Sequence, residues 1–499
     1  MKELVFLNLL LATVFTTHGQ SSDQGKHAPG VSYRVETIQT PEGLTSATGA
    51  LQFMPDGRLV ACFLRGEVMI YDPASRKWSL FAEGLQEPLG ILVVNNSEIL
   101  VMQRPELTRI KDTDGDGHAD LYETVTDDFG ISGNYHEFNY GPLKDKEGNL
   151  FIGLNSSSAN GTVRSEVRGK LDTLTLNQKG QMFSAVPYRG WIMKLTTNGN
   201  LVPYASGFRS PNGLGFDLNG NLFAADNQGD WVGSSAFYHV LPGRFYGHPA
   251  SLVWEAGWNR GNPLLLPVRE LEKMKKKAAV VFPHGIIANS PSQPLCDDTR
   301  GKFGPYGGQF FVGEMNQERI VRVMVEEVDG ELQGACTPFI DQKGLQKGNN
   351  RLAFAPDGSL WVGQAIEQGW AGDKGIQRVV FTGMPPMDIM SMHLTKTGFE
   401  LNFTQEVDEK VIGKLDNFKF KRYNYEYHSK YGSEQFNVSE VAVTKIDVAP
   451  GGKKVMLQLE SLQPGFVYQL NLKNVKSRQG KPLENNIICY TVNKLRPAQ

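Results

Sequence analysis

The chain has 499 residues, of which 40% are hydrophobic and 21% are charged. Its 51 Lys and Arg residues against 53 Asp and Glu residues give a net charge of −2, which argues against a nucleic-acid partner. The length allows one large domain and one small one. The one cluster of like charge, four lysines in residues 273–277, follows a pattern over residues 269–274 that predicts a short solvated helix.

The N-terminus predicts an export signal. Lys2 precedes an apolar run over residues 4–15, and Thr17 and Gly19 suit cleavage by a signal peptidase before Gln20. We therefore expect residues 1–19 to be a signal peptide and the mature protein to be periplasmic or secreted. No later stretch approaches the roughly 20 apolar residues of a spanning helix, so no membrane span is expected.

The chain has four cysteines, at Cys62, Cys296, Cys336 and Cys489. In an oxidising compartment they allow three pairings. Cys296 with Cys336 is the one pairing that we retain, because both flank the same apolar strand region. Four separate buried thiols are the alternative.

A hairpin motif repeats through residues 31–382. Each copy has a short apolar strand, a turn with an Asp-Gly or Asn-Gly character, and a second strand, as in residues 51–61 and 351–362. The equivalent apolar positions of the six copies are Leu59, Ile99, Leu150, Leu222, Phe310 and Leu360. Their spacing of 40 to 88 residues predicts an all-β fold, a six-bladed β-propeller with inserted loops.

Residues 112–123 have the spacing of a calcium loop. Carboxylates stand at positions 1, 3, 5, 9 and 12 of an EF-hand-type loop, with glycine at position 6 and a backbone carbonyl at position 7. The predicted ligands are Asp112, Asp114, Asp116, His118, Asp120 and Glu123. We expect a structural Ca²⁺ in a loop between strands, with an acidic solvated loop as the alternative.

The hydrophobic pattern of residues 387–499 differs from that of the repeats. Polar and apolar residues alternate, as in residues 399–403 and 455–459, which predicts a small β-sandwich. Residues 463–470 and 481–483 resemble bacterial Ig-like modules of exported enzymes. We expect this domain to pack on the propeller or to hold a partner, without a catalytic role.

Four motifs of the propeller region resemble those of the soluble aldose (glucose/sorbosone) dehydrogenases, and in particular the exported dehydrogenase-like propellers of environmental bacteria. The matching stretches are residues 134–143, 207–214, 226–230 and 245–249. The resemblance implies a six-bladed quinoprotein. Such an enzyme transfers hydride from the C1 hydroxyl of a small carbohydrate to pyrroloquinoline quinone, and passes electrons to an exported acceptor.

The same resemblance implies roles for individual residues. His136 is the expected base, because an imidazole with a pKa near 6.5 suits proton abstraction at neutral pH. Arg209 would polarise the quinone oxygen, and a second Ca²⁺ would lie near Gly229 and Asp230. Arg351 would pair with a cofactor carboxylate.

Two positions depart from the family pattern. Asn349 falls where the family has a second arginine of the cofactor shell, and the resemblance still implies a cofactor-binding role for this position; Glu314 falls where the family has a lysine. Aromatic residues of the fourth blade could stack a sugar ring or belong to the core. These are Trp231, Tyr246, Trp254 and Trp258.

Two other functions remain open. Residues 210–214, followed by Asp226, also resemble calcium-dependent lactonase propellers, which hold a metal in the central channel with an acidic residue and asparagines. The third hypothesis is a non-enzymatic propeller that binds a glycan or a protein. A shared fold does not decide between them.

Overall fold

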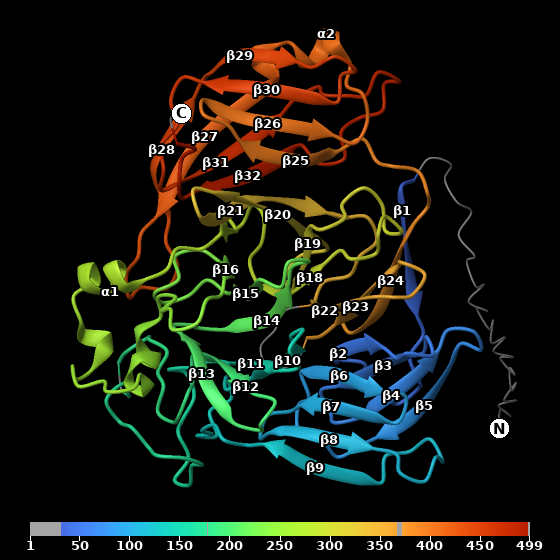
Figure 1. Ribbon diagram of the computed structural model, residues 1–499, viewed down its shortest axis with the longest axis vertical. Coiled ribbons are helices and arrows are strands. Elements are labelled where there is room, and N and C mark those ends of the chain that lie inside the picture. Colours follow the sequence, from blue (N-terminus) through green and yellow to red (C-terminus); the bar gives the residue numbers. More distant parts are fainter. Residues whose placement is uncertain (1–30, 177, 367–371, 498–499) are drawn as a thin grey trace, which may run out of the picture.

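The computed structural model describes residues 31–176, 178–366 and 372–497. The predicted signal peptide, residues 1–19, lies outside the described residues. Within them, six antiparallel sheets of four strands follow one another along the chain (Figure 1). The first strand of each sheet contacts the first strands of its two neighbours in a closed ring, so these six strands surround a central channel.

Each blade runs from an inner strand at the channel to an outer strand at the rim. Blades one to three contain β2 (Thr48–Phe53), β3 (Leu59–Phe63), β4 (Val68–Asp72) and β5 (Lys77–Ala82); β6 (Gly90–Asn95), β7 (Glu98–Met102), β8 (Leu107–Lys111) and β9 (Leu121–Thr126); and β10 (Asn139–Lys144), β11 (Leu150–Leu154), β12 (Trp191–Leu195) and β13 (Leu201–Ser206). Blades four to six contain β14 (Pro211–Phe216), β15 (Leu222–Asp226), β16 (Ala236–His239) and β17 (Val280–Val281); β18 (Pro291–Cys296), β19 (Phe310–Glu314), β20 (Ile320–Val328) and β21 (Glu331–Phe339); and β22 (Asn349–Phe354), β23 (Leu360–Gln364), β24 (Gly375–Phe381) and β1 (Tyr33–Ile38).

Blade six joins the two ends of the propeller. β1 pairs with β24 from Tyr33 opposite Phe381 to Ile38 opposite Ile376. The all-β propeller predicted from the repeats is confirmed. All six residues identified as equivalent lie at the first or second position of the second strand of a blade.

Helical structure is sparse and gathers in the insertion between β16 and β17. This insertion contains η1 (Pro249–Trp254), η2 (Pro263–Leu265) and α1 (Val268–Met274). In α1 only Leu271 is buried, which confirms the short solvated helix expected there. No helix among the described residues is long and apolar enough to cross a membrane.

A β-sandwich follows the propeller. Its first sheet contains, in spatial order, β25 (Ile389–Leu394), β26 (Gly398–Phe403), β30 (Lys454–Leu459) and β29 (Val443–Val448), and its second contains β32 (Ile487–Val492), β31 (Phe466–Leu472), β27 (Phe418–Tyr425) and β28 (Gln435–Val441). Short helices α2 (Glu409–Ile412) and η3 (Leu415–Asn417) lie between β26 and β27. The sheets meet through buried rings, with Phe399 stacked on Phe420 at 5.6 Å between ring centroids.

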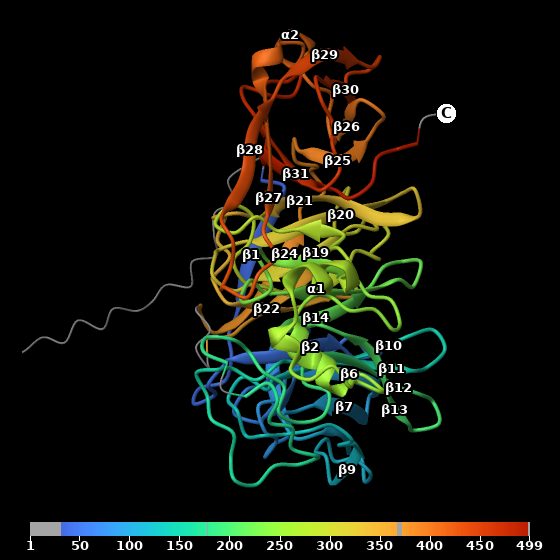
Figure 2. The same cartoon turned by 90° about the vertical axis from the view of Figure 1, so that its left-hand side faces the viewer.

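The second sheet of the sandwich continues a blade of the propeller. β32 pairs with β21, the outer strand of blade five, with Ala335 opposite Tyr490. Met324 and Ala335 of blade five belong to the same buried cluster as Phe399. The sandwich therefore packs on the propeller, as expected, and shares a core with it (Figures 1 and 2).

All four cysteines are free and buried, so the pairing of Cys296 with Cys336 is absent. Cys296 lies on β18 and Cys336 on β21, with β19 and β20 between them. Neighbouring strands are about 4.8 Å apart, so three strand spacings exceed the roughly 7 Å between Cα atoms that a disulfide can bridge. The alternative of separate buried thiols is the one that the fold adopts.

The shared core gives a test of coupling between the domains. Phe399→Ala removes a fully buried ring from the sandwich, which should lower the free energy of unfolding by ~3–5 kcal/mol. All seven tryptophans lie before residue 371, so tryptophan fluorescence reports on the propeller and on the contact of Trp231 with Tyr427, and not on the interior of the sandwich. In urea, we expect the fluorescence-detected midpoint to fall together with the midpoint from circular dichroism. Leu415→Ala, at a position 47% exposed, is the control. An unchanged fluorescence midpoint would show that the domains unfold independently.

Candidate functional site

The catalytic and cofactor-binding residues predicted from the sequence lie at one end of the central channel. His136 precedes inner strand β10, Arg209 precedes β14, and Arg351 lies near the start of β22. Since the inner strands surround the axis, the beginnings of β10, β14 and β22 lie at the same mouth of the channel. The fold therefore gathers residues that are more than 200 positions apart in the chain.

His136 is a partly buried, neutral imidazole with one open nitrogen. Its Nδ1 lies 2.9 Å from the Ser156 carbonyl oxygen, which can only accept, so Nδ1 carries the proton. Burial, with the nearby Arg209 guanidinium, lowers the pKa of His136 to about 4. No described residue hydrogen-bonds Nε2, so this unprotonated nitrogen can accept a proton.

Arg209 is held by a buried carboxylate. Its Nε donates to Asp230 Oδ1 at 3.2 Å, and its side chain lies along the backbone of Gly229. A Cβ at Gly229 would lie 1.8 Å from Arg209 Nε, so a larger residue there would displace the Arg209 side chain from this position. Neither Nη atom of Arg209 has a hydrogen-bond partner among the described residues, so both are available to an oxygen of a bound molecule.

Asp230 has both carboxylate oxygens engaged. Its Oδ2 accepts from the Met182 backbone N–H at 2.7 Å and lies 2.9 Å from Nε2 of the fully buried His248. Although burial opposes ionisation, the charges of His248 and Arg209 together with hydrogen bonds lower the pKa of Asp230 to about 2. The carboxylate is therefore a fixed anion that orients Arg209.

Asp226 fixes the backbone that carries Arg209. Its two oxygens accept from the backbone N–H groups of Arg209 and Ser210 at 2.9 and 2.6 Å. Burial raises the pKa of Asp226. The Asp226 side chain therefore stabilises the backbone turn that precedes β14.

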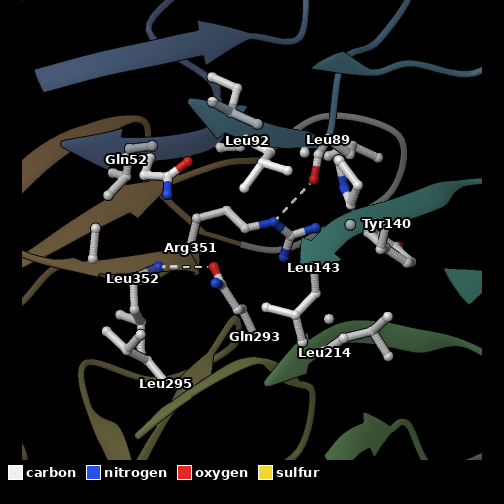
Figure 3. Close-up of a pocket in the computed structure, with 18 of the residues that line it drawn as sticks. Gln52, Leu89, Leu92, Tyr140, Leu143, Leu214, Gln293, Leu295, Arg351 and Leu352 are labelled. Atoms are coloured by element: carbon white, nitrogen blue, oxygen red, sulfur yellow. Dashed lines mark hydrogen bonds between the residues drawn. The ribbon is translucent and has the colours of Figure 1, made fainter. Parts of the chain in front are cut away.

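Arg351 lines a cavity between the inner strands, where it lies near Leu89 and Tyr140 (Figure 3). Its Nε donates to the Leu89 carbonyl at 3.2 Å, and its Nη1 donates to the side-chain oxygens of Asn350 and Asn212 at 2.8 and 3.1 Å. Its Nη2 is buried without a partner in the described part of the chain. Burial lowers the pKa of Arg351 to about 10, and no described carboxylate pairs with it.

The cavity that Arg351 lines has a volume of about 350 Å³ and lies along the inner strands. The residues that Figure 3 labels around it are mostly leucines, together with Gln52, Gln293, Tyr140 and Arg351. Gln293 accepts from the Leu352 backbone N–H at 3.2 Å. Asp298 is a further polar residue in the lining of this cavity.

Asn349 and Glu314 serve the protein's own backbone. The Asn349 amide donates to carbonyls of Arg319 and Gln346 and accepts from Gln364. Glu314 accepts from three backbone N–H groups, of residues 289, 290 and 316. With these atoms engaged, we do not include Asn349 or Glu314 among the residues that would hold a cofactor.

Sequence reasoning assigned no role to His248 or to Arg189. The fully buried Arg189 donates to the Gly130 carbonyl and to Asn139 Oδ1, and burial lowers its pKa to about 10. Like Arg351, it has no ion-pair partner among the described carboxylates. His248 lay in one of the motifs that carried the resemblance, but only the fold brings it to Asp230.

The quinone cofactor implied by the resemblance is a tricarboxylate. Two buried guanidiniums, those of Arg189 and Arg351, have no ion-pair partner among the described carboxylates. Open N–H groups remain on Arg209 and on Nη2 of Arg351. Arg209 and Arg351 therefore fit an anionic group.

The second Ca²⁺ expected near Gly229 and Asp230 does not fit. Both Asp230 oxygens are engaged by protein donors, and the Gly229 carbonyl accepts from the Gly432 and Val232 N–H groups at 2.9 and 3.2 Å. The guanidinium of Arg209 already supplies a positive charge beside them. We therefore assign no calcium there.

The predicted calcium loop joins β8 and β9 at the outer edge of blade two. Carboxylate oxygens of Asp112, Asp114 and Asp116 lie within 4.8 Å of one another. Asp120 instead accepts from the Thr113 backbone and hydroxyl. These three converging carboxylates suit a hard divalent cation.

Glu123, the last predicted position, differs from an EF-hand. Glu123 lies on β9, opposite Arg109 of β8, and pairs with it at 2.5 Å, because a strand and not a helix begins at Leu121. His118 donates its backbone N–H to Asp116 Oδ1 at 2.8 Å. The structure thus brings three of the six predicted ligands together.

Residues 71–368 match the model of a family described as a domain of unknown function, DUF7133. The chain belongs to the DUF7133 family. The match runs from blade one through blade six and contains all the site residues named above. A comparison with curated proteins gives no match.

Several solved structures resemble this DUF7133 chain over its propeller. A glucose dehydrogenase-type oxidoreductase of Thermus thermophilus is 19% identical over 70% of this chain and 100% of its own, with a TM-score of 0.49. The PQQ-bound aldose sugar dehydrogenase of Streptomyces coelicolor is 16% identical over 71% and 99%, with a TM-score of 0.45. The PQQ domain of pyranose dehydrogenase from Coprinopsis cinerea is 13% identical over 71% and 96%, with a TM-score of 0.49. At these values, the chemistry of those proteins does not transfer to this chain by similarity.

The His136 imidazole makes stability depend on pH. Its pKa is about 4 in the folded state and ~6.5 when unfolded, so the unfolded state binds more protons between these values and stability falls as pH falls. Between pH 7.5 and 5, the wild type should lose ~2 kcal/mol relative to His136→Gln in urea titrations. His393, whose pKa is raised by Glu326, is the matched control, and His393→Gln should show the opposite sign. Equal pH dependence of wild type and His136→Gln would contradict this assignment.

Calcium should stabilise the 112–120 loop. Because three carboxylates converge, bound Ca²⁺ relieves their repulsion, and at 100 times its Kd it adds ~2.7 kcal/mol. We expect EDTA to lower the Tm of the wild type and to leave the Tm of Asp116→Asn unchanged. Asp128→Asn, an exposed aspartate of the same blade, should keep the wild-type response. A wild-type Tm that ignores complete calcium removal would contradict the site.

Proposed function

We propose that this protein is an exported oxidoreductase that takes hydride from the C1 hydroxyl of a sugar, with pyrroloquinoline quinone as the acceptor. The observation that carries the proposal is the juxtaposition at the channel mouth of a neutral His136, with an unprotonated Nε2, and Arg209, with two open Nη groups. A base beside a fixed cation is what oxidation of a hydroxyl requires.

The residues at the channel mouth have separate roles in the proposed reaction. His136 Nε2 accepts the proton of the C1 hydroxyl, while the Ser156 carbonyl fixes the tautomer through Nδ1. Arg209 would stabilise the negative charge that develops on the quinone oxygen. Asp230 keeps the Arg209 guanidinium in place. The hydrogen on C1 leaves as hydride with both electrons of the C1–H bond, so the sugar becomes a lactone.

Arg209 and Arg351 would hold the cofactor through its carboxylates and quinone oxygens. Pyrroloquinoline quinone, when bound, accepts the hydride. An exported acceptor would then take the electrons. Export rests on the predicted signal peptide, residues 1–19.

The calcium-dependent lactonase is the weaker candidate. The side-chain oxygens of Asn212 and Asn350 already accept hydrogen bonds from the Arg351 guanidinium. A divalent cation at the same oxygens would meet this fixed positive charge at close range. We therefore favour the oxidoreductase, and lactone hydrolysis becomes an outcome of the test. A glycan- or protein-binding propeller would show neither activity.

The proposal is tested with the purified mature protein, pyrroloquinoline quinone, CaCl₂ and a redox dye. We expect dye reduction with at least one aldose, and His136→Gln should lower kcat by about 10²–10⁴-fold without loss of cofactor binding. His393→Gln, in the sandwich, should behave as the wild type. Cofactor binding is followed separately by absorbance.

Two results would contradict the proposal. One is failure of the wild type to bind the quinone or to reduce dye with any aldose of a broad panel. The other is hydrolysis of a sugar lactone that survives His136→Gln and is lost in Asp226→Asn, which would favour the lactonase.

A further inference from the structure

A loop of the sandwich reaches the mouth of the propeller. β27 and β28 run from the sandwich down one side of the propeller (Figure 2), and the loop between them, residues 426–434, meets propeller residues 229–233. We call these segments the sandwich loop and the site loop. The site loop carries Asp230, so the sandwich loop contacts the backbone of the residue whose carboxylate holds Arg209.

The two loops are joined by backbone hydrogen bonds. Gly432 N–H donates to the Gly229 carbonyl at 2.9 Å, Trp231 N–H to the His428 carbonyl at 3.0 Å, and Ser433 N–H to the Gly233 carbonyl at 2.8 Å. Such a ladder requires close approach: a Cβ at Gly233 would lie 2.7 Å from the Glu426 carbonyl oxygen. The site loop is therefore shaped by contact with the sandwich.

Trp231 shows that this contact holds an unfavourable conformation. Its φ is 62°, in the left-handed region that bulky side chains avoid, at a cost of order 1–3 kcal/mol. The bond to His428 and the Tyr427 ring, 5.2 Å from the Trp231 ring, hold it there. The indole is 3% exposed, so it belongs to the core and offers no face to a ligand.

Tyr431, on the sandwich loop, does offer such a face. Its ring lies 5.3 Å from the Arg209 guanidinium carbon, and its backbone bridges to Asp230. Yet the residue is 69% exposed, more than any other aromatic residue in the described part of the chain. One side of this ring rests near Arg209, and the rest faces solvent beside the site.

We propose that Tyr431 stacks on the sugar ring at the channel mouth, so that the C-terminal domain completes the substrate site. This inference rests on the proposed function for its substrate class. The aliphatic C–H face of a pyranose suits an exposed aromatic ring. The contact with Arg209 places the Tyr431 ring next to the guanidinium that would stabilise charge in the proposed reaction.

The test uses methyl β-D-glucoside, whose blocked C1 oxygen has no hydroxyl proton to lose, so binding is measured without turnover. In saturation-transfer NMR titrations of the full-length mature protein, Tyr431→Ala should raise the Kd about 3- to 10-fold. Tyr431→Phe, which keeps the ring, should stay within about 2-fold of wild type. Tyr122→Ala removes a tyrosine that is 45% exposed on blade two, and should have no effect.

The proposal is overturned if Tyr431→Ala binds the glucoside as tightly as the wild type, or if the wild type does not bind it. With glucose as the reacting substrate, Tyr431→Ala should raise KM and leave kcat within about 2-fold. Tyr431-dependent glucoside binding without any dye reduction would support the stacking role and contradict only the dehydrogenase. Dye reduction with an unchanged KM in Tyr431→Ala would contradict only the stacking role.

Discussion

The site depends on one buried carboxylate. Asp230 is 1% exposed and receives Arg209, His248 and a backbone N–H, so its charge is compensated on every side. A buried anion of this kind is costly unless it is fully paired, and the pairing fixes the geometry of each partner. Arg209 thereby lies near His136, whose pKa it helps to lower. The chemistry proposed for this protein follows from that arrangement.

The carboxylate is itself held from two domains. The site loop belongs to blade four, but three hydrogen bonds attach it to the sandwich loop. The sandwich is in turn fixed because β32 extends the sheet of blade five and shares its core. A movement of the sandwich relative to the propeller would therefore shift Asp230, and with it the Arg209 side chain that Asp230 holds. This rigid attachment explains how a domain without expected catalytic residues can shape the site.

Local patterns in the sequence were sufficient for the propeller. The hairpin repeats mark the second strand of every blade, since a strand and its turn are decided by adjacent residues. Pairings between distant segments were not predictable: β32 beside β21 and Tyr431 beside Arg209 depend on tertiary packing. His136 was identified by a motif, whereas the matching position of Asn349 did not predict its role, because its amide donates to backbone carbonyls of Arg319 and Gln346. The calcium loop lies between two strands, as the sequence indicated, but Glu123 was not predictable as an ion-pair partner, because its cross-strand neighbour Arg109 is decided by the pairing of β8 with β9.

The most direct measurement of the central claim is the protonation state of His136. Nitrogen-15 NMR of histidine-labelled protein, with the His136 signals assigned by comparison with His136→Gln, reports both the tautomer and the titration. We predict a proton on Nδ1, none on Nε2, and a midpoint near pH 4. An Nε2-protonated tautomer, or a midpoint at 6.5 or above, would contradict the account.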